Sequence, residues 1–366
     1  MRYTRVIPPV VLLAALSACT DQTPSFNPTP APTRPGQVVV IAGSPENYDP
    51  PRDGEYAIRS SAQSEGGLAV DSASGAIYLR VVSGSDKPVE RIEPDGTLTV
   101  FHPKNPGDQL GLTRETLWIM SSYKGVRLSK MSLTSLAETE MLNTGRGHEI
   151  EVLDPSGDPL DARKREGLRE TWADSRLVIR GDGVPVIVSR AGRLYEVAGP
   201  DKIREWNPTG YGEVLGNLTK GADLRPASAV AVGSNGLLIL ARSGLLQIGD
   251  GRARGIRIRM LSHGLPEWSA ALPLDDGSTL LLGGTSAAEP DPRPGLVRQN
   301  GKLELLTYGK RRRCEGFDGS MGVLASSDPV GTSRMNNGDF VVADQTCGRV
   351  YRVRPPRQLA GVPHTR

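Results

Sequence analysis

A sequence pattern of short apolar runs separated by turn-forming residues is repeated along the chain. Its clearest copy spans residues 66–101, where the turn signals SASG, SGSDKP and EPDG divide the apolar runs. Apolar runs between such turns are typical of a four-stranded antiparallel meander. Further copies span residues 176–206, 228–260, 270–307 and 331–355, and a degenerate copy spans 110–142. This repeat, with a spacing of roughly 40 residues, predicts an array of small β-sheets.

The two ends of the repeat region predict how this array closes. One meander cannot bury both of its faces, so copies pack face to face around an axis, as in a β-propeller. The last copy ends after its third strand, and an isolated apolar run, QVVVIAG at 37–43, precedes the first copy. We expect 37–43 to pair with 349–354 and hide both open edges. The predicted fold is all-β, a six-bladed β-propeller with insertions near 143–170 and 308–330.

Composition and charge agree with a turn-rich exported domain. The 43 glycines and 29 prolines, together with only 5% aromatic residues, favour many short strands over long helices. The formal net charge is +3, and removal of a leader that contains Arg2 and Arg5 leaves +1. A charge this close to zero provides no electrostatic basis for binding nucleic acid.

The first residues read as an export signal. Arg2 and Arg5 precede an apolar run that is too short to span a bilayer, and residues 16–19 read Leu-Ser-Ala-Cys, the form of a lipobox. We expect Cys19 to carry lipid and to anchor the protein to the cell membrane, facing outside the cytoplasm. The expected organisation is a signal peptide at 1–18, a Pro-rich tether at 19–36, the propeller at 37–356 and a tail at 357–366.

Two segments resemble the NHL repeat of six-bladed propellers. The first is VVVIAG…RDGEYA…GGLAVDSASGAIYL…VERIEPDGTLTVF, and the second is GDFVVADQTCGRVYRV, which places Asp344 after the inner strands. The resemblance covers most of 37–356 and implies an interaction surface more often than chemistry. Related six-bladed propellers include metal-dependent gluconolactonases and copper-using amidating lyases, and similar domains form extracellular sensor parts of receptor kinases. The fold alone therefore does not decide the function.

The three cysteines divide into one lipid site and one pair. With Cys19 assigned to lipid, Cys314 and Cys347 remain as an even pair in an oxidising compartment. We expect them to form a disulfide that ties the loop before the last copy to the hairpin of that copy. The chain has no C-x-x-C pair that would favour a redox role.

Loops that enter the inner strands would line one mouth of the propeller channel. Alignment of the copies on those strands places six candidate binding residues there: Glu65, Trp172, Arg225, Glu267, Trp268 and Asp328. Glu65, Glu267 and Asp328 are the best available metal ligands among them, although Arg225 would repel a cation. The mixture does not suit a tight cation cage, and a solvated rim explains the spread of acids equally well; no cofactor is expected.

Other chemistry-bearing patterns have plainer explanations. His102, His148, His263 and His364 are scattered, whereas a copper or zinc site needs converging imidazoles. The sequence Arg180-Gly181-Asp182-Gly183 lies where other copies have a turn, so turn chemistry explains it.

The sequence therefore predicts a membrane-anchored, monomeric binding module for a protein, glycan or cell-wall ligand, without catalysis of its own. The alternative is a divalent-metal-dependent hydrolase or lyase, similar to gluconolactonases, with its site at the channel mouth. A sensory or solute-gathering subunit that works with a transporter or kinase is a third possibility.

Overall fold

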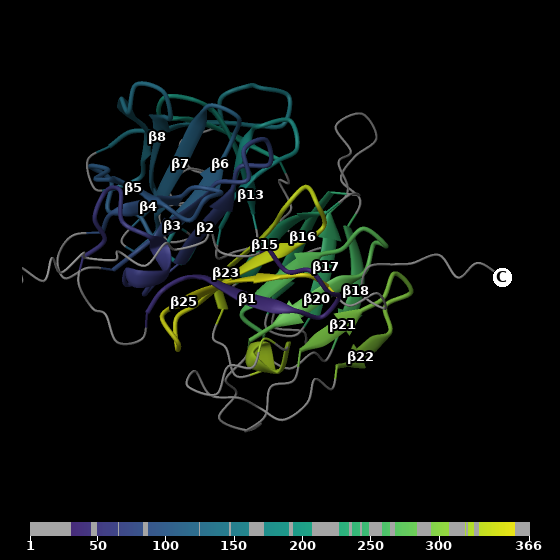
Figure 1. The fold of residues 1–366 in the computed structure, drawn as a ribbon. Coiled ribbons are helices and arrows are strands. Elements are labelled where there is room, and N and C mark those ends of the chain that lie inside the picture. Colours follow the sequence, from purple (N-terminus) through teal and green to yellow (C-terminus); the bar gives the residue numbers. More distant parts are fainter. Residues whose placement is uncertain are drawn as a thin grey trace, which may run out of the picture.

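The computed structural model describes most of the chain between residues 31 and 355. The described ranges are 31–44, 50–64, 66–82, 87–123, 125–145, 148–160, 172–189, 193–206, 227–233, 236–241, 244–248, 258–263, 268–283, 294–306, 319, 321–325 and 329–355. The expected all-β propeller fold is confirmed, and the described strands form six sheets (Figure 1).

Each sheet is a run of antiparallel strands that are consecutive in the sequence, with two exceptions discussed below. The first three sheets contain β2 (Gly66–Val70), β3 (Ile77–Arg80), β4 (Val89–Ile92) and β5 (Leu98–Phe101); β6 (Gln109–Leu112), β7 (Thr116–Ser121), β8 (Arg127–Ser132) and β9 (Glu138–Asn143); and β10 (Glu151–Leu153), β11 (Arg176–Ile179), β12 (Pro185–Val188), β13 (Leu194–Gly199) and β14 (Lys202–Glu205). The other three contain β15 (Ala227–Gly233), β16 (Gly236–Ala241), β17 (Gly244–Ile248) and β18 (Ile258–His263); β19 (Ala270–Pro273), β20 (Thr279–Leu282), β21 (Gly295–Val297) and β22 (Leu303–Leu305); and β1 (Val38–Ala42), β23 (Pro329–Arg334), β24 (Phe340–Asp344) and β25 (Arg349–Val353).

One turn design joins many of these strands. In five hairpins a glycine N–H donates to the carbonyl three residues earlier, and a preceding Asp or Asn side chain accepts from the backbone N–H two residues further on. The five acceptors are Asp95, Asp182, Asp276, Asn300 and Asn337. Such turns hold the strand register locally, because the side chain replaces a backbone partner at the bend.

The innermost strands contact one another in a closed circuit. Along it, β2 contacts β6, β6 contacts β11, β11 contacts β15, β15 contacts β19, β19 contacts β23, and β23 returns to β2. Apolar clusters lie between neighbouring sheets: Tyr78, Leu110 and Ile119 belong to one, and Trp118, Leu177 and Ile187 to the next. The second sheet therefore buries both of its faces, as the repeat pattern requires.

The first strand of the chain completes the last sheet. β1 pairs antiparallel with β25, with Val38 opposite Val353 and Val40 opposite Tyr351. Figure 1 shows the purple β1 beside the yellow β25, so segments from the two ends of the described chain lie side by side. This is the pairing expected between 37–43 and 349–354.

One strand was not expected from the sequence. β10 lies within the segment 143–170, interpreted there as an insertion, and it pairs parallel with β14 at the outer edge of its sheet. A charged pair joins the two strands, because Lys202 Nζ lies 2.6 Å from Glu151 Oε2. The strand has three residues and no repeat neighbour, so the repeat pattern did not predict it.

Candidate functional site

A cavity of about 420 Å³ lies where the inner strands begin. Its described lining comes from the starts of β2, β6, β11, β19 and β23 and from Gln345, which follows β24. This position matches the channel mouth expected from the sequence, because each inner strand enters the ring there. The lining includes one carboxylate, Asp108, one guanidinium, Arg176, and the hydroxyl of Thr332.

The Gln109 side chain joins two inner strands beside the cavity. Its Nε2 donates to the carbonyl of Ser175 at 2.8 Å and to Ser122 Oγ at 3.3 Å, and its Oε1 accepts the N–H of Leu177 at 2.8 Å. The amide therefore bonds the backbone on both sides of Arg176. Because β6 and β11 belong to different sheets, no backbone ladder joins them. The Gln109 side chain links them instead, and so it positions Arg176.

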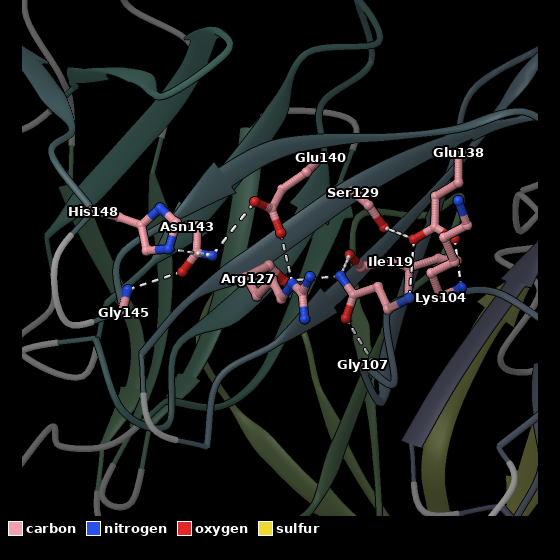
Figure 2. A network of polar contacts seen from close by, with 11 residues as sticks. Lys104, Gly107, Ile119, Arg127, Ser129, Glu138, Glu140, Asn143, Gly145 and His148 are labelled. Atoms are coloured by element: carbon pink, nitrogen blue, oxygen red, sulfur yellow. Dashed lines mark hydrogen bonds and ion pairs between the residues drawn. The ribbon is translucent and has the colours of Figure 1, made fainter.

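The connection that leads to Asp108 is held by a polar network in the second sheet (Figure 2). The buried Asn105 donates through Nδ2 to the carbonyls of Ile119, at 2.9 Å, and Arg127, at 3.1 Å, and its Oδ1 accepts the N–H of Gly107. Glu138 accepts the N–H of Asn105 at 3.0 Å and the Ser129 hydroxyl at 2.7 Å. These bonds fix the chain immediately before Asp108.

The same network continues to the edge of the sheet. Arg127 Nε donates to Glu140 Oε2 at 2.6 Å, and this bond holds the pKa of Glu140 below its ordinary value. Asn143 Nδ2 lies 3.4 Å from both Glu140 Oε1 and His148 Nε2 (Figure 2). This outer part is exposed, so it contributes little to stability and serves mainly to order β8 and β9.

Two of the six expected mouth residues lie within the described chain, and both are buried. Trp172 is 1% exposed and packs against Tyr195, with ring centroids 5.0 Å apart. Trp268 is 4% exposed and lies in the apolar cluster with Leu281 and Val297. Neither indole offers a face to a ligand from solvent, so both contribute to packing.

The other four expected mouth residues, Glu65, Arg225, Glu267 and Asp328, lie outside the described residues, as do the three metal candidates among them. Glu65 and Asp328 each precede a lining residue directly in sequence. Sequence reasoning missed Asp108 and Gln109, because the copy at 110–142 is degenerate. Their place immediately before the inner strand of that copy could have identified them.

The Arg-Gly-Asp segment is an internal turn, as expected. The Gly183 N–H donates to the Arg180 carbonyl at 2.8 Å. The Arg180 side chain is 6% exposed, pairs with Asp182 and Glu196, and lies over the Trp206 ring at 5.4 Å. The Asp182 hydrogen bond, with help from Glu196, raises the pKa of Arg180 above its ordinary value despite burial. The guanidinium is thus held within the sheet.

The cysteine and membrane predictions fall partly outside the described chain. Cys347 is buried between β24 and β25, whereas its expected partner Cys314 and the lipid candidate Cys19 lie outside the described residues. The Cys314–Cys347 pairing therefore stays a prediction. No helix in the described ranges has the length and apolar character needed to cross a membrane. Among the same residues, no three His, Cys, Asp or Glu side chains gather as metal ligands.

Comparisons with known proteins support the fold. No known sequence family matches the chain, and no curated protein matches it. A solved protein of unknown function from Bacteroides thetaiotaomicron is similar with a TM-score of 0.51 and 11% identity, covering 86% of this chain and 75% of its own. A solved putative gluconolactonase is similar with a TM-score of 0.51 and 9% identity, covering 90% of this chain and 97% of its own. At these identities the likeness establishes the β-propeller fold and nothing beyond it.

Proposed function

We propose that this protein is a lipid-anchored binding module that faces outside the cytoplasm. Its six sheets act as the blades of one six-bladed ring closed by β1, and the mouth of that ring binds a protein, glycan or cell-wall ligand. The observation that carries the proposal is the mouth cavity, because it combines a carboxylate, a guanidinium and a hydroxyl on the starts of inner strands. Concave sites with a few fixed polar groups are typical of ligand binding.

The arrangement of the mouth supports binding more than metal-dependent hydrolysis. A divalent cation needs several oxygen ligands, and Asp108 shares its cavity with the cationic Arg176, which would repel the ion. The likeness to a putative gluconolactonase is a likeness of fold and adds no ligand set. Hydrolysis or lysis of a lactone or related substrate stays the alternative, because Glu65, Glu267 and Asp328 lie outside the described chain.

Site-specific photo-crosslinking in intact cells tests the binding proposal. A photoreactive residue replaces Thr332 in the cavity lining, and a control replaces Arg114, which is exposed at the opposite end of β6 from the mouth. We expect a discrete crosslinked product from position 332 and none from position 114. Equal products from both positions, or none from either, would refute a specific binding mouth.

Two further measurements test the anchor and the alternative function. Radiolabelled palmitate should enter the wild-type protein and not the Cys19→Ala variant, and label retained in the variant would exclude this lipid site. Thermal unfolding of the full-length protein in detergent, first with a chelator and then with calcium, zinc, copper or magnesium, tests the hydrolase reading. A saturable rise in melting temperature with one metal, lost in Glu267→Ala, would replace the binding proposal with the enzyme.

A further inference from the structure

The mouth cavity contains polar groups whose hydrogen-bonding capacity is unused. Within the described part of the chain, the half-buried Asp108 carboxylate takes part in no hydrogen bond or ion pair. The Thr332 hydroxyl and the Gln345 side-chain amide make no described contact either. A half-buried carboxylate without a partner can accept hydrogen bonds from a cationic group of a ligand in the cavity.

The two charged residues of the described lining stand at the starts of neighbouring inner strands, where hydrogen bonds hold the backbone next to them. Asp108 immediately precedes β6, and Arg176 begins β11. Gln109 bonds the backbone on both sides of Arg176, and Asn105 and Glu138 fix the chain before Asp108. Opposite charges in one cavity complement a ligand that carries both signs, because a ligand with only one sign would meet one repelling group.

We propose that the mouth binds a small zwitterion of amino-acid or short-peptide size, with its ammonium group on Asp108 and its carboxylate on Arg176. The carboxylate and guanidinium each form charge-assisted hydrogen bonds with the opposite ligand group. Thr332 and Gln345 supply neutral hydrogen bonds to the rest of the ligand. The cavity of about 420 Å³ falls within the range of small-ligand sites and exceeds the size of one amino acid. This inference rests on the proposed binding function and specifies its ligand class.

Isothermal titration calorimetry on the full-length protein in detergent tests the charge requirement. The probes are glycine and glycylglycine, which carry both charges, N-acetylglycine, which carries only the carboxylate, and glycinamide, which carries only the ammonium group. We expect the better zwitterion to bind at least about tenfold more tightly than either singly charged probe, as one lost charge-assisted bond implies. Equal affinities for all four probes, or heat from none, would overturn the proposal.

Conservative variants assign the two roles. Asp108→Asn should abolish the preference for glycine over N-acetylglycine, and Arg176→Gln the preference for glycine over glycinamide. The controls Asp158→Asn and Arg114→Gln remove the same charges at exposed positions away from the cavity and should leave both preferences unchanged. Circular dichroism confirms that each variant is folded. Unchanged preferences in the two mouth variants would exclude the assigned contacts.

The result also separates this inference from the function on which it rests. Crosslinking at position 332 without zwitterion binding would leave the binding module in place and refute the ligand class. Loss of both signals would refute the binding mouth itself.

Discussion

Gly43 is where replacement of a single hydrogen by a methyl group should open the closure of the ring. The residue follows β1 with a φ of +92°, and a Cβ there would lie 2.1 Å from the Gly348 carbonyl oxygen and 2.9 Å from Arg349 Cα. Both neighbours are backbone atoms, so no change of rotamer relieves the contact. The end of β1 would have to move away from β25.

The cost of Gly43→Ala has two parts that a matched variant separates. A left-handed backbone costs an alanine about 1–2 kcal/mol, and the forced displacement adds about 1–3 kcal/mol. Gly54 has a similar φ of +79° but nothing within 4 Å of its Cβ position. Gly54→Ala should therefore lose only the first part, and the difference between the two variants measures the close approach.

Urea unfolding followed by tryptophan fluorescence provides the measurement, because all four tryptophans are buried. Native-state hydrogen exchange gives the location: in Gly43→Ala the β25 amides should exchange faster than those of β3, which lies in another sheet. Equal losses of unfolding free energy in Gly43→Ala and Gly54→Ala, or unchanged exchange in β25, would refute the proposed closure.

Two buried carboxylates provide the remaining predictions. Burial raises the pKa of Glu90 well above its ordinary value, so wild-type stability should fall as the pH rises from about 4.5 through the native pKa. Glu90→Gln should remove this loss, and urea unfolding at pH 4, 6 and 8 should show its advantage over wild type growing with pH; a constant difference would contradict the assignment. Asp339 accepts hydrogen bonds from Arg352 and Arg354 at 2.8–2.9 Å. Because both arginines are partly exposed, water can solvate them when the carboxylate is removed, and Asp339→Ala should lower the free energy of unfolding by about 2–4 kcal/mol. The same assay should give a loss below about 1 kcal/mol for Asp275→Ala, because Asp275 is exposed. Similar losses for both variants would contradict a stabilising role for the buried Asp339.

The mouth residues show where prediction from sequence failed. Trp172 and Trp268 were expected at the mouth because they lie in the loops that enter inner strands, but both indoles are buried in apolar clusters. Position in sequence defines which loop a residue belongs to and leaves the direction of its side chain open. A large apolar ring next to a sheet interface gains more by burial there than at a hydrated rim.

Asp108 and Gln109 show the opposite failure. Both lie at the start of an inner strand, yet the degenerate copy at 110–142 lacked the apolar alternation needed to align that strand. In the structure, the Gln109 side chain forms hydrogen bonds with the backbone of Ser175 and Leu177, which lie 66 and 68 residues later in the chain. No local sequence pattern predicts a contact over that distance in the chain, because the contact depends on how two sheets pack.

By itself, the sequence determined the local parts of this protein: the short strands, the Asp-Gly and Asn-Gly hairpin turns, the grouping of strands into sheets, and the pairing of β1 with β25. These follow from residue order, since strand alternation and turn chemistry act between near neighbours or between complementary free edges. Only the tertiary structure decided that Asp108 and Arg176 share one cavity and that Gln109 positions the latter. The physical reason is that the ring brings together the starts of inner strands from separate sheets. The packing of sheet against sheet then decides which side chains meet there.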